Sequence, residues 1–215
     1  MRKLTSISVA LLVIGMCMSA QATQTVVYSW ENGGTILGTG TSNNTVIATN
    51  VTNEVYDGSK SLELDDTTST AAYTYLAWVQ GLNAGDTVTA SFWVYDTTPS
   101  GSPSGRIWGH YDNSATNPLE YDGSASGNST YSGATPWTQL SYTWTMPAGD
   151  TGFVLECRIY SSGATPAPSP TTPASIWVDD LSITAPDYAT VVLPTPEPAT
   201  LALLGLGSLF FVRRK

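Results

Sequence analysis

Aromatic side chains in two short segments are the residues best suited to bind a ligand. Residues 87–95 alternate in character, so Trp93 and Tyr95 share one face of an extended strand. Trp108 and Tyr111 lie in a second, glycine-flanked segment that also holds an arginine, a histidine and an aspartate. Aromatic rings stack on the faces of sugars, and polar neighbours can bind the hydroxyls. These four aromatic residues are therefore predicted to form a carbohydrate-binding platform; the alternative is that they pack in the core.

The chain is poorly supplied with catalytic groups. His110 is its only histidine, so a Ser-His-Asp system would have to use it, and no Gly-x-Ser-x-Gly sequence precedes a helical pattern. The sequence contains no CxxC, HExxH, phosphate-loop or EF-hand spacing. A pair among the 17 acidic residues could still hydrolyse a glycosidic bond, which keeps a small polysaccharide hydrolase as an alternative. The prediction is a protein that is not an enzyme.

The distribution of charge argues against nucleic acid as a partner. Five of the eight basic residues lie at the two ends of the chain, which leaves Lys60, Arg106 and Arg158 for the rest of a sequence with 17 acidic residues. Such a negative surface repels phosphate backbones and anionic lipids. Neutral glycans and divalent cations are compatible with it.

Residues 1–22 are predicted to be a signal peptide. Two basic residues precede an apolar helical stretch over 7–18, and Ala20-Gln21-Ala22 is a small-x-small sequence that signal peptidase can bind. Cys17 follows a methionine instead of a small residue, which argues against a lipoprotein signal. Cys157 is then the only cysteine of the mature chain, so an intramolecular disulfide is excluded. Its alternating apolar neighbours predict that Cys157 is a buried apolar side chain.

The last segment of the chain, residues 196–215, combines three features in order. Pro196-Glu197-Pro198 comes first, an uncharged apolar run over 199–212 follows, and Arg213-Arg214-Lys215 ends the chain. As a transmembrane helix this run would be about 21 Å long, which is short against a hydrocarbon core of about 30 Å. Basic residues resist translocation, so the C-terminal end should stay in the cytoplasm while the preceding chain lies outside the membrane.

This segment resembles the PEP-CTERM sorting signal of Gram-negative bacteria, which has a Pro-Glu-Pro triplet, a hydrophobic helix and a basic end. The matching positions are Pro196, Glu197 and Pro198, together with Arg213 and Arg214. The resemblance implies that an exosortase cleaves near the triplet. The expected protein is an inner-membrane-anchored precursor that is exported, processed and delivered to the cell surface or extracellular matrix. The alternative is a plain C-terminal membrane anchor.

Between the two terminal signals the sequence favours an all-β fold. It is rich in Thr, Ser, Gly, Asn and Tyr, and short alternating segments are separated by turn sequences. Strands are predicted at 25–30, 45–51, 60–65, 71–80, 87–95, 105–111, 140–146, 153–160 and 175–183. Loops rich in proline, serine and threonine are predicted at 96–105 and 161–173. Residues 23–184 should form a single antiparallel β-sandwich, and residues 185–195 an extended linker.

Five sequence elements of this body resemble the jelly-roll carbohydrate-binding modules attached to bacterial glycanases. In chain order they are Trp30-Glu31-Asn32-Gly33, the Gly-x-x-Ser-Leu segment within 55–62, the segment 81–94 that begins Gly-Leu-Asn-Ala-Gly, Trp137-Thr138-Gln139-Leu140, and the segment 176–181. Val88 stands where those modules usually have a tyrosine. The resemblance implies a jelly-roll sandwich over about residues 28–184.

In those modules a structural calcium ion ties the first strand to the last. At the matching positions, the resemblance implies Glu31, Lys60 and Asp180 as ligands, with Asp179 as the competing aspartate. Ca²⁺ takes six to eight oxygen ligands, which carboxylates and backbone carbonyls supply. Adjacent aspartates also repel each other, and a cation would relieve this repulsion. The alternative is a solvated acidic strand end.

The sequence as a whole predicts an exported, exosortase-processed surface or extracellular-matrix protein. Its β-sandwich is predicted to be non-catalytic and to bind extracellular polysaccharide. The main alternative is a purely structural or adhesive surface protein without a sugar ligand. Signal peptidase and an exosortase are the expected processing partners, and the inner membrane holds the precursor before processing.

Overall fold

The computed structural model describes residues 21–40, 46–68, 70–97, 102–127 and 137–196. The segments of the sequence in which apolar and polar side chains alternate form β-strands in it. In these ranges the regular elements are all strands. They are β1 (Thr23–Tyr28), β2 (Gly38–Thr39), β3 (Val46–Val51), β4 (Ser61–Asp66), β5 (Ala71–Gln80), β6 (Thr87–Tyr95), β7 (Ser104–Asp112), β8 (Gly123–Ser126), β9 (Trp137–Thr145), β10 (Gly152–Tyr160), β11 (Ala174–Pro186) and β12 (Thr190–Val192).

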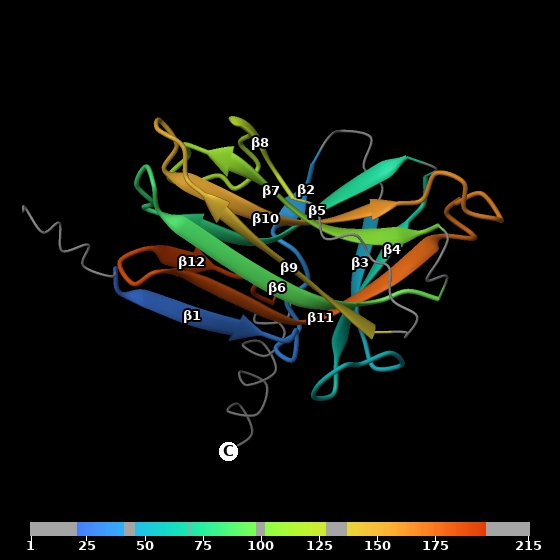
Figure 1. Ribbon diagram of the computed structural model, residues 1–215. Helices are drawn as coiled ribbons and strands as arrows, with labels where there is room; N and C mark the ends of the chain where they lie inside the picture. Colours follow the sequence, from blue (N-terminus) through green and yellow to red (C-terminus); the bar gives the residue numbers. More distant parts are fainter. Residues whose placement is uncertain (1–20, 41–45, 69, 98–101, 128–136, 197–215) are drawn as a thin grey trace, which may run out of the picture.

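The strands form two antiparallel sheets that face each other (Figure 1). The first, called the β6 sheet here, has the order β3-β4-β11-β6-β9, and β1 also pairs with β11. The second, called the β10 sheet, has the order β12-β5-β10-β7-β8, and β2 also pairs with β5. Strands that are distant in sequence therefore lie side by side in both sheets. The predicted single antiparallel β-sandwich is confirmed.

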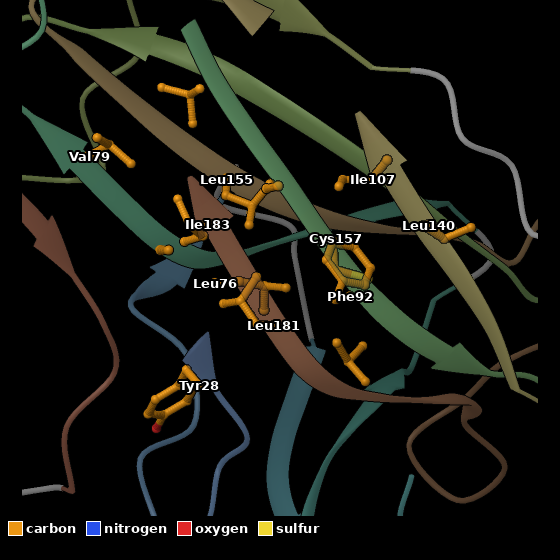
Figure 2. Packing of buried hydrophobic residues seen from close by; sticks show 14 of the residues in the cluster. Tyr28, Leu76, Val79, Phe92, Ile107, Leu140, Leu155, Cys157, Leu181 and Ile183 are labelled. Atoms are coloured by element: carbon orange, nitrogen blue, oxygen red, sulfur yellow. The ribbon is translucent and has the colours of Figure 1, made fainter. Parts of the chain in front are cut away.

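The core lies between the two sheets and is built from the apolar side chains that alternate inward along each strand. Figure 2 shows Leu76, Leu155 and Cys157 from the β10 sheet facing Phe92 and Leu181 from the β6 sheet. All five are fully buried. Each large apolar side chain removed from water contributes about 1.5–3 kcal/mol. The prediction that Cys157 is a buried apolar residue is confirmed, and burial raises the pKa of its thiol.

A bulge in β5 changes which side chains face outward. The pairing of β5 with β10 shifts register between Leu155 and Glu156, so Leu76 has no cross-strand partner. Leu76 and its neighbour Ala77 both point into the core. The alternation restarts after them, and as a result Tyr73, Tyr75 and Trp78 all lie on the outer face of the β10 sheet.

The sandwich continues beyond residue 184. β11 runs to Pro186, and after a short turn β12 pairs with β5 along the edge of the β10 sheet. Val191 and Leu193 pack against the core, and the carbonyl oxygen of Pro194 accepts a 2.9 Å hydrogen bond from the Tyr28 hydroxyl. The predicted extended linker over 185–195 is therefore wrong for most of its length, because β-branched and apolar residues there complete a sheet edge.

The predicted helices at the two ends of the chain lie outside the described residues. This applies to most of the signal peptide, 1–22, and to the hydrophobic segment 199–212. Within the ranges that the structure describes, no helix has the length and apolar character needed to cross a membrane.

Candidate functional site

The outer face of the β10 sheet carries a pocket of about 450 Å³. Aromatic, hydroxyl-bearing and charged side chains line it together: Tyr73, Tyr75, Leu119, Tyr121, Ser124, Glu156 and Arg158, with Gly40. β5 supplies the partly buried Tyr73 and the buried Tyr75, β10 supplies the charged pair, and the loop between β7 and β8 supplies Tyr121. Burial raises the pKa of Tyr75 to about 12, and the nearby Glu156 adds to this effect. Its hydroxyl therefore stays protonated and can donate a hydrogen bond.

Glu156 is the centre of a buried charged network in this pocket. In the register of β10 with β7, Val154 lies opposite His110 and Glu156 lies opposite Trp108, so Glu156 can reach His110 diagonally. Its Oε1 lies 2.6 Å from His110 Nδ1, and its Oε2 accepts a 2.5 Å hydrogen bond from Arg158 Nε. The side chains of His110 and Glu156 are 0% and 2% exposed. Two basic partners therefore fix the carboxylate in one position.

His110 connects this network to the loop between β7 and β8. Its Nε2 lies 3.1 Å from the carbonyl oxygen of Glu120. The imidazole contacts two tyrosine rings, with centroid distances of 4.8 Å to Tyr75 and 5.4 Å to Tyr121. Tyr121 is 58% exposed, so its ring is available to a ligand at the mouth of the pocket. The buried histidine thus positions an exposed aromatic residue.

Arg158 is held between aromatic rings on the same face. Its guanidinium carbon lies 4.1 Å from the centre of the Tyr73 ring and 4.5 Å from that of Trp108. The Trp108 indole donates a 3.0 Å hydrogen bond to Ser124 Oγ. Burial opposes the charge of Arg158, but the hydrogen bond and charge of Glu156 outweigh burial and raise the pKa of Arg158 above its usual value. The pocket therefore contains fixed charges and aromatic faces next to each other.

The four aromatic residues proposed from the sequence as one platform do not come together. Trp108 lies beside the pocket, on the outer face of the β10 sheet. Tyr111 points to the inner side of the same strand, where its ring packs edge-on against Phe153 with centroids 6.5 Å apart. Trp93 and Tyr95 are half-buried on the outer face of the β6 sheet, on the opposite side of the sandwich. The predicted platform is thus divided between two faces and the core.

Sequence reasoning missed most of the pocket residues. Glu156 and Arg158 are charged residues on one face of a strand whose other face is apolar. This pattern is the sequence signal that could have identified them as pocket residues. Tyr73 and Tyr75 were obscured by the bulge in β5. Tyr121 lies in a loop, where no periodicity indicates the direction of a side chain.

Two of the residues proposed as calcium ligands, Glu31 and Asp179, hold one turn from two sides, and Lys60 is part of that turn. Glu31 accepts hydrogen bonds from the backbone N–H groups of Ser59 and Lys60, at 2.8 and 2.9 Å, and from the Ser59 hydroxyl at 2.5 Å. The Ser59 hydroxyl and these N–H groups lower the pKa of Glu31. Gly58 suits this turn because its φ of 77° lies in the left-handed region, and a Cβ at this position would also lie 2.4 Å from Glu31 Oε1.

Asp179 holds the same turn from the last long strand. Its Oδ2 accepts hydrogen bonds from the N–H groups of Tyr56 and Asp57, at 3.0 and 3.1 Å. Its Oδ1 accepts one from Asp180, which sits in the left-handed region at φ 49° where β11 is bulged. Burial raises the pKa of Asp179, and these N–H groups act in the opposite direction. Glu31 and Asp179 therefore reach the same turn, and hydrogen-bond donors engage all four of their carboxylate oxygens. The calcium site stays a prediction.

Among the described residues, no group of three or more His, Cys, Asp and Glu side chains is arranged to hold a metal ion. Of the predicted sorting-signal residues, Pro196 is described, whereas Glu197, Pro198, Arg213 and Arg214 lie outside the described residues.

Comparison with known families gives two matches. The profile of the PEP-CTERM protein-sorting motif matches residues 194–215. The profile of a carbohydrate binding domain matches residues 26–165, from the middle of β1 to beyond the end of β10. No curated protein shows significant similarity to the sequence.

Solved structures show the same fold at low sequence identity. The CBM22-1 xylan-binding domain of Xyn10C from Paenibacillus barcinonensis has a TM-score of 0.50 and 16% identity, over 78% of this chain and 98% of that domain. The CBM22-1-CBM22-2 tandem domain of the same protein has a TM-score of 0.50 and 14% identity, over 84% of this chain and 49% of the tandem. At these identities the likeness establishes the architecture of the sandwich.

Proposed function

We infer the function from the premise that the chain belongs to the carbohydrate binding domain family and ends in a PEP-CTERM sorting motif. It is an exported protein, and we propose that the pocket on its β10 sheet binds a neutral polysaccharide outside the cell. The observation that carries the proposal is the pocket itself. It places the exposed ring of Tyr121 next to the buried polar groups of Glu156 and Arg158.

The chemistry of the pocket suits a sugar. A pyranose presents an apolar face of C–H groups and a rim of hydroxyls, so it needs an aromatic surface and nearby donors and acceptors. Tyr121 offers the surface, while the hydroxyl groups of Tyr75 and Ser124 can donate or accept. The 17 acidic residues of the chain disfavour a polyanionic ligand, because like charges repel.

The proposed role is non-catalytic. Glycoside hydrolysis needs two carboxyl groups that flank the bond, one of which transfers a proton. Glu156 is the only carboxylate among the described residues that line the pocket, and its two oxygens are engaged by His110 and Arg158. It orders the pocket and does not offer a free oxygen to a substrate.

The proposed life cycle follows from the sorting motif. In a Gram-negative host, signal peptidase would remove residues 1–22, and the C-terminal segment would hold the precursor in the inner membrane. An exosortase would then process the protein near the Pro-Glu-Pro triplet. The polysaccharide-binding domain would act at the cell surface or in the extracellular matrix.

Native gels that contain xylan, glucomannan or mixed-linkage β-glucan test the proposal. The processed protein, purified from its host, should be retarded by at least one of these polymers. Tyr121→Ala should weaken this binding about tenfold, because loss of an aromatic contact at a binding site costs about 1–2 kcal/mol. Ile47→Ala is the matched control, since Ile47 is similarly exposed, at 52%, but lies in the other sheet. Equal retardation of the Tyr121→Ala variant and wild type would refute the assignment of this pocket.

A further inference from the structure

A strip of aromatic residues crosses the outer face of the β6 sheet, on the side of the sandwich away from the pocket. Tyr95 on β6 lies opposite Trp137 of β9 on one side and opposite Trp177 of β11 on the other. Trp93 is two residues before Tyr95 on the same face. The inward residues of these strands, such as Val94, form the core, so the strip is additional to it.

The rings of the strip contact one another in a continuous series. Tyr56 stacks on Trp93 with ring centroids 4.0 Å apart and an interplanar angle of 16°. Tyr56 also contacts Trp137, and Tyr95 contacts both Trp137 and Trp177, in edge-on geometry at centroid distances of 5.4–5.7 Å. Tyr56 is 41% exposed, so the series reaches solvent. A solvent-facing sheet surface usually carries polar side chains, and five clustered aromatic residues indicate a binding surface.

A second, independent observation concerns Trp177, which lies at one end of the strip. Trp177 is 8% exposed, and its indole Nε1–H has no hydrogen-bond partner among the described residues. The same side chain lines a pocket of about 240 Å³. Described residues after β6 and after β10 line this pocket together with the start of β11, and its polar residues carry hydroxyls: Thr97, Ser102, Thr165 and Ser175. A buried donor without a partner is costly, so it points to an acceptor that a ligand would supply.

We propose that this aromatic strip and its adjoining pocket form a second binding site for a neutral polysaccharide, with a sugar oxygen accepting from Trp177 Nε1. The two sites lie on opposite outer faces of one sandwich. The two sheets of a sandwich pack about 10 Å apart, and the two sites face away from each other. One short polysaccharide segment could not occupy both sites, so one domain would hold two polysaccharide chains close together. The protein would then cross-link the polymer as well as attach to it.

Charge selects a neutral sugar as the occupant. A second copy of this chain would bring two strongly acidic surfaces together, since the sequence has 17 acidic and eight basic residues, five of the latter at the chain ends. A polyanionic polymer meets the same repulsion. A neutral polysaccharide does not, and its C–H faces and hydroxyls match the rings and the unpaired indole donor.

The test compares five forms of the processed protein. They are wild type, the pocket variant Tyr121→Ala, the single variant Trp177→Phe, the strip variant Trp177→Phe with Tyr56→Ala, and the combination of Tyr121→Ala with the strip variant. Trp177→Phe removes the indole N–H and keeps an aromatic ring. The indole is 8% exposed and packs against Tyr95, so the smaller ring of Trp177→Phe should lower the melting temperature. At a temperature at which this variant is fully folded, loss of the N–H donor should weaken binding about fivefold to tenfold. A purely structural role of Trp177 would lower the melting temperature in the same way but leave binding by the folded variant equal to that of wild type. Ile47→Ala, an exposed change in the same sheet, is the control.

Two measurements are made in xylan, glucomannan and β-glucan. In affinity gels, the pocket and strip variants should each keep part of the retardation, and the combined variant should lose it all. Wild type should increase the light scattering of a soluble polymer, because it cross-links the polymer chains. Each variant that retains only one site should cause no such increase. The proposal rests on the same ligand class as the pocket but on different residues.

The outcomes separate the two sites. If the strip variant matches wild type in both measurements, or if Tyr121→Ala alone abolishes retardation, the second site is refuted and the pocket stands. If the strip variant alone abolishes retardation while Tyr121→Ala has no effect, the pocket assignment fails and the strip stands. If sedimentation shows that wild type is a dimer and the strip variant a monomer, the strip is a self-association surface and the proposal is overturned.

Discussion

Replacement of Glu156 tests whether one carboxylate organises the pocket. Glu156 binds His110 at 2.6 Å and Arg158 at 2.5 Å, and the three side chains are 2%, 0% and 10% exposed respectively. Glu156→Gln keeps the size of the side chain and removes its charge. The two basic groups would then remain next to each other without the anion that separates them.

The expected loss of stability follows from this burial. Removal of one partner from a buried ion pair costs about 3–5 kcal/mol, because the remaining charge is left without compensation. Arg158 keeps its contacts with two aromatic rings and is partly solvated, so the lower end of this range is expected. For a domain of this size, 1 kcal/mol corresponds to about 2–4 °C, which gives a decrease in melting temperature of about 6–12 °C.

Thermal unfolding followed by circular dichroism measures this decrease, and Glu120→Gln is the matched control. Glu120 is an exposed acidic residue on the adjacent loop, so its charge change should shift the melting temperature by about 2 °C or less. The double variant Glu156→Gln with Arg158→Met should lose less stability than the two single losses combined, with a coupling of about 1–3 kcal/mol. A melting temperature for Glu156→Gln within about 2 °C of wild type would refute the argument, since the network would then not be coupled.

Three further predictions concern other parts of the fold. Millimolar calcium should raise the melting temperature of the processed protein by several degrees but not that of Glu31→Ala, and an unchanged wild type in scanning fluorimetry would exclude the calcium site. Burial raises the pKa of Tyr28 and Tyr75 to about 12 from an ordinary value of 10.0, so the unfolded chain loses these protons first. The free energy of unfolding should therefore fall between pH about 10 and about 12, less steeply in Tyr75→Phe, as urea titrations at each pH would show. Truncation after residue 196 should preserve stability, whereas truncation after residue 189 removes β12 and should lower it; equal urea midpoints for the two would contradict the role of β12.

The strands were predictable because most of them alternate cleanly. Residues 71–80 and 87–95 were predicted as strands with the bounds that β5 and β6 have. The short strands β2, β8 and β12 were not predicted, because two to four residues carry too little periodic signal. Their place depends on the sheet edge that each one joins.

The site was less predictable because local irregularities decide which way side chains point. On β7, Gly105 and Gly109 face the core together with Tyr111, so the apolar pattern that marks an inner face is missing. Gly109 is required there because a Cβ would lie 2.4 Å from the ring of Phe153. The sequence therefore placed Tyr111 outward with Trp108, although the odd spacing puts them on opposite faces.

The end of the fold constrains how the sorting motif can work. The sandwich is closed by the bond from Tyr28 to the carbonyl of Pro194, and the triplet begins at Pro196. One intervening residue spans at most about 3.6 Å. If processing occurs near the triplet, as the motif implies, the enzyme must reach its site directly beside the folded domain. The domain would then rest at the membrane surface during processing, and cleavage after the triplet would leave every strand in place. The domain would therefore bind polysaccharide equally well before and after that cleavage.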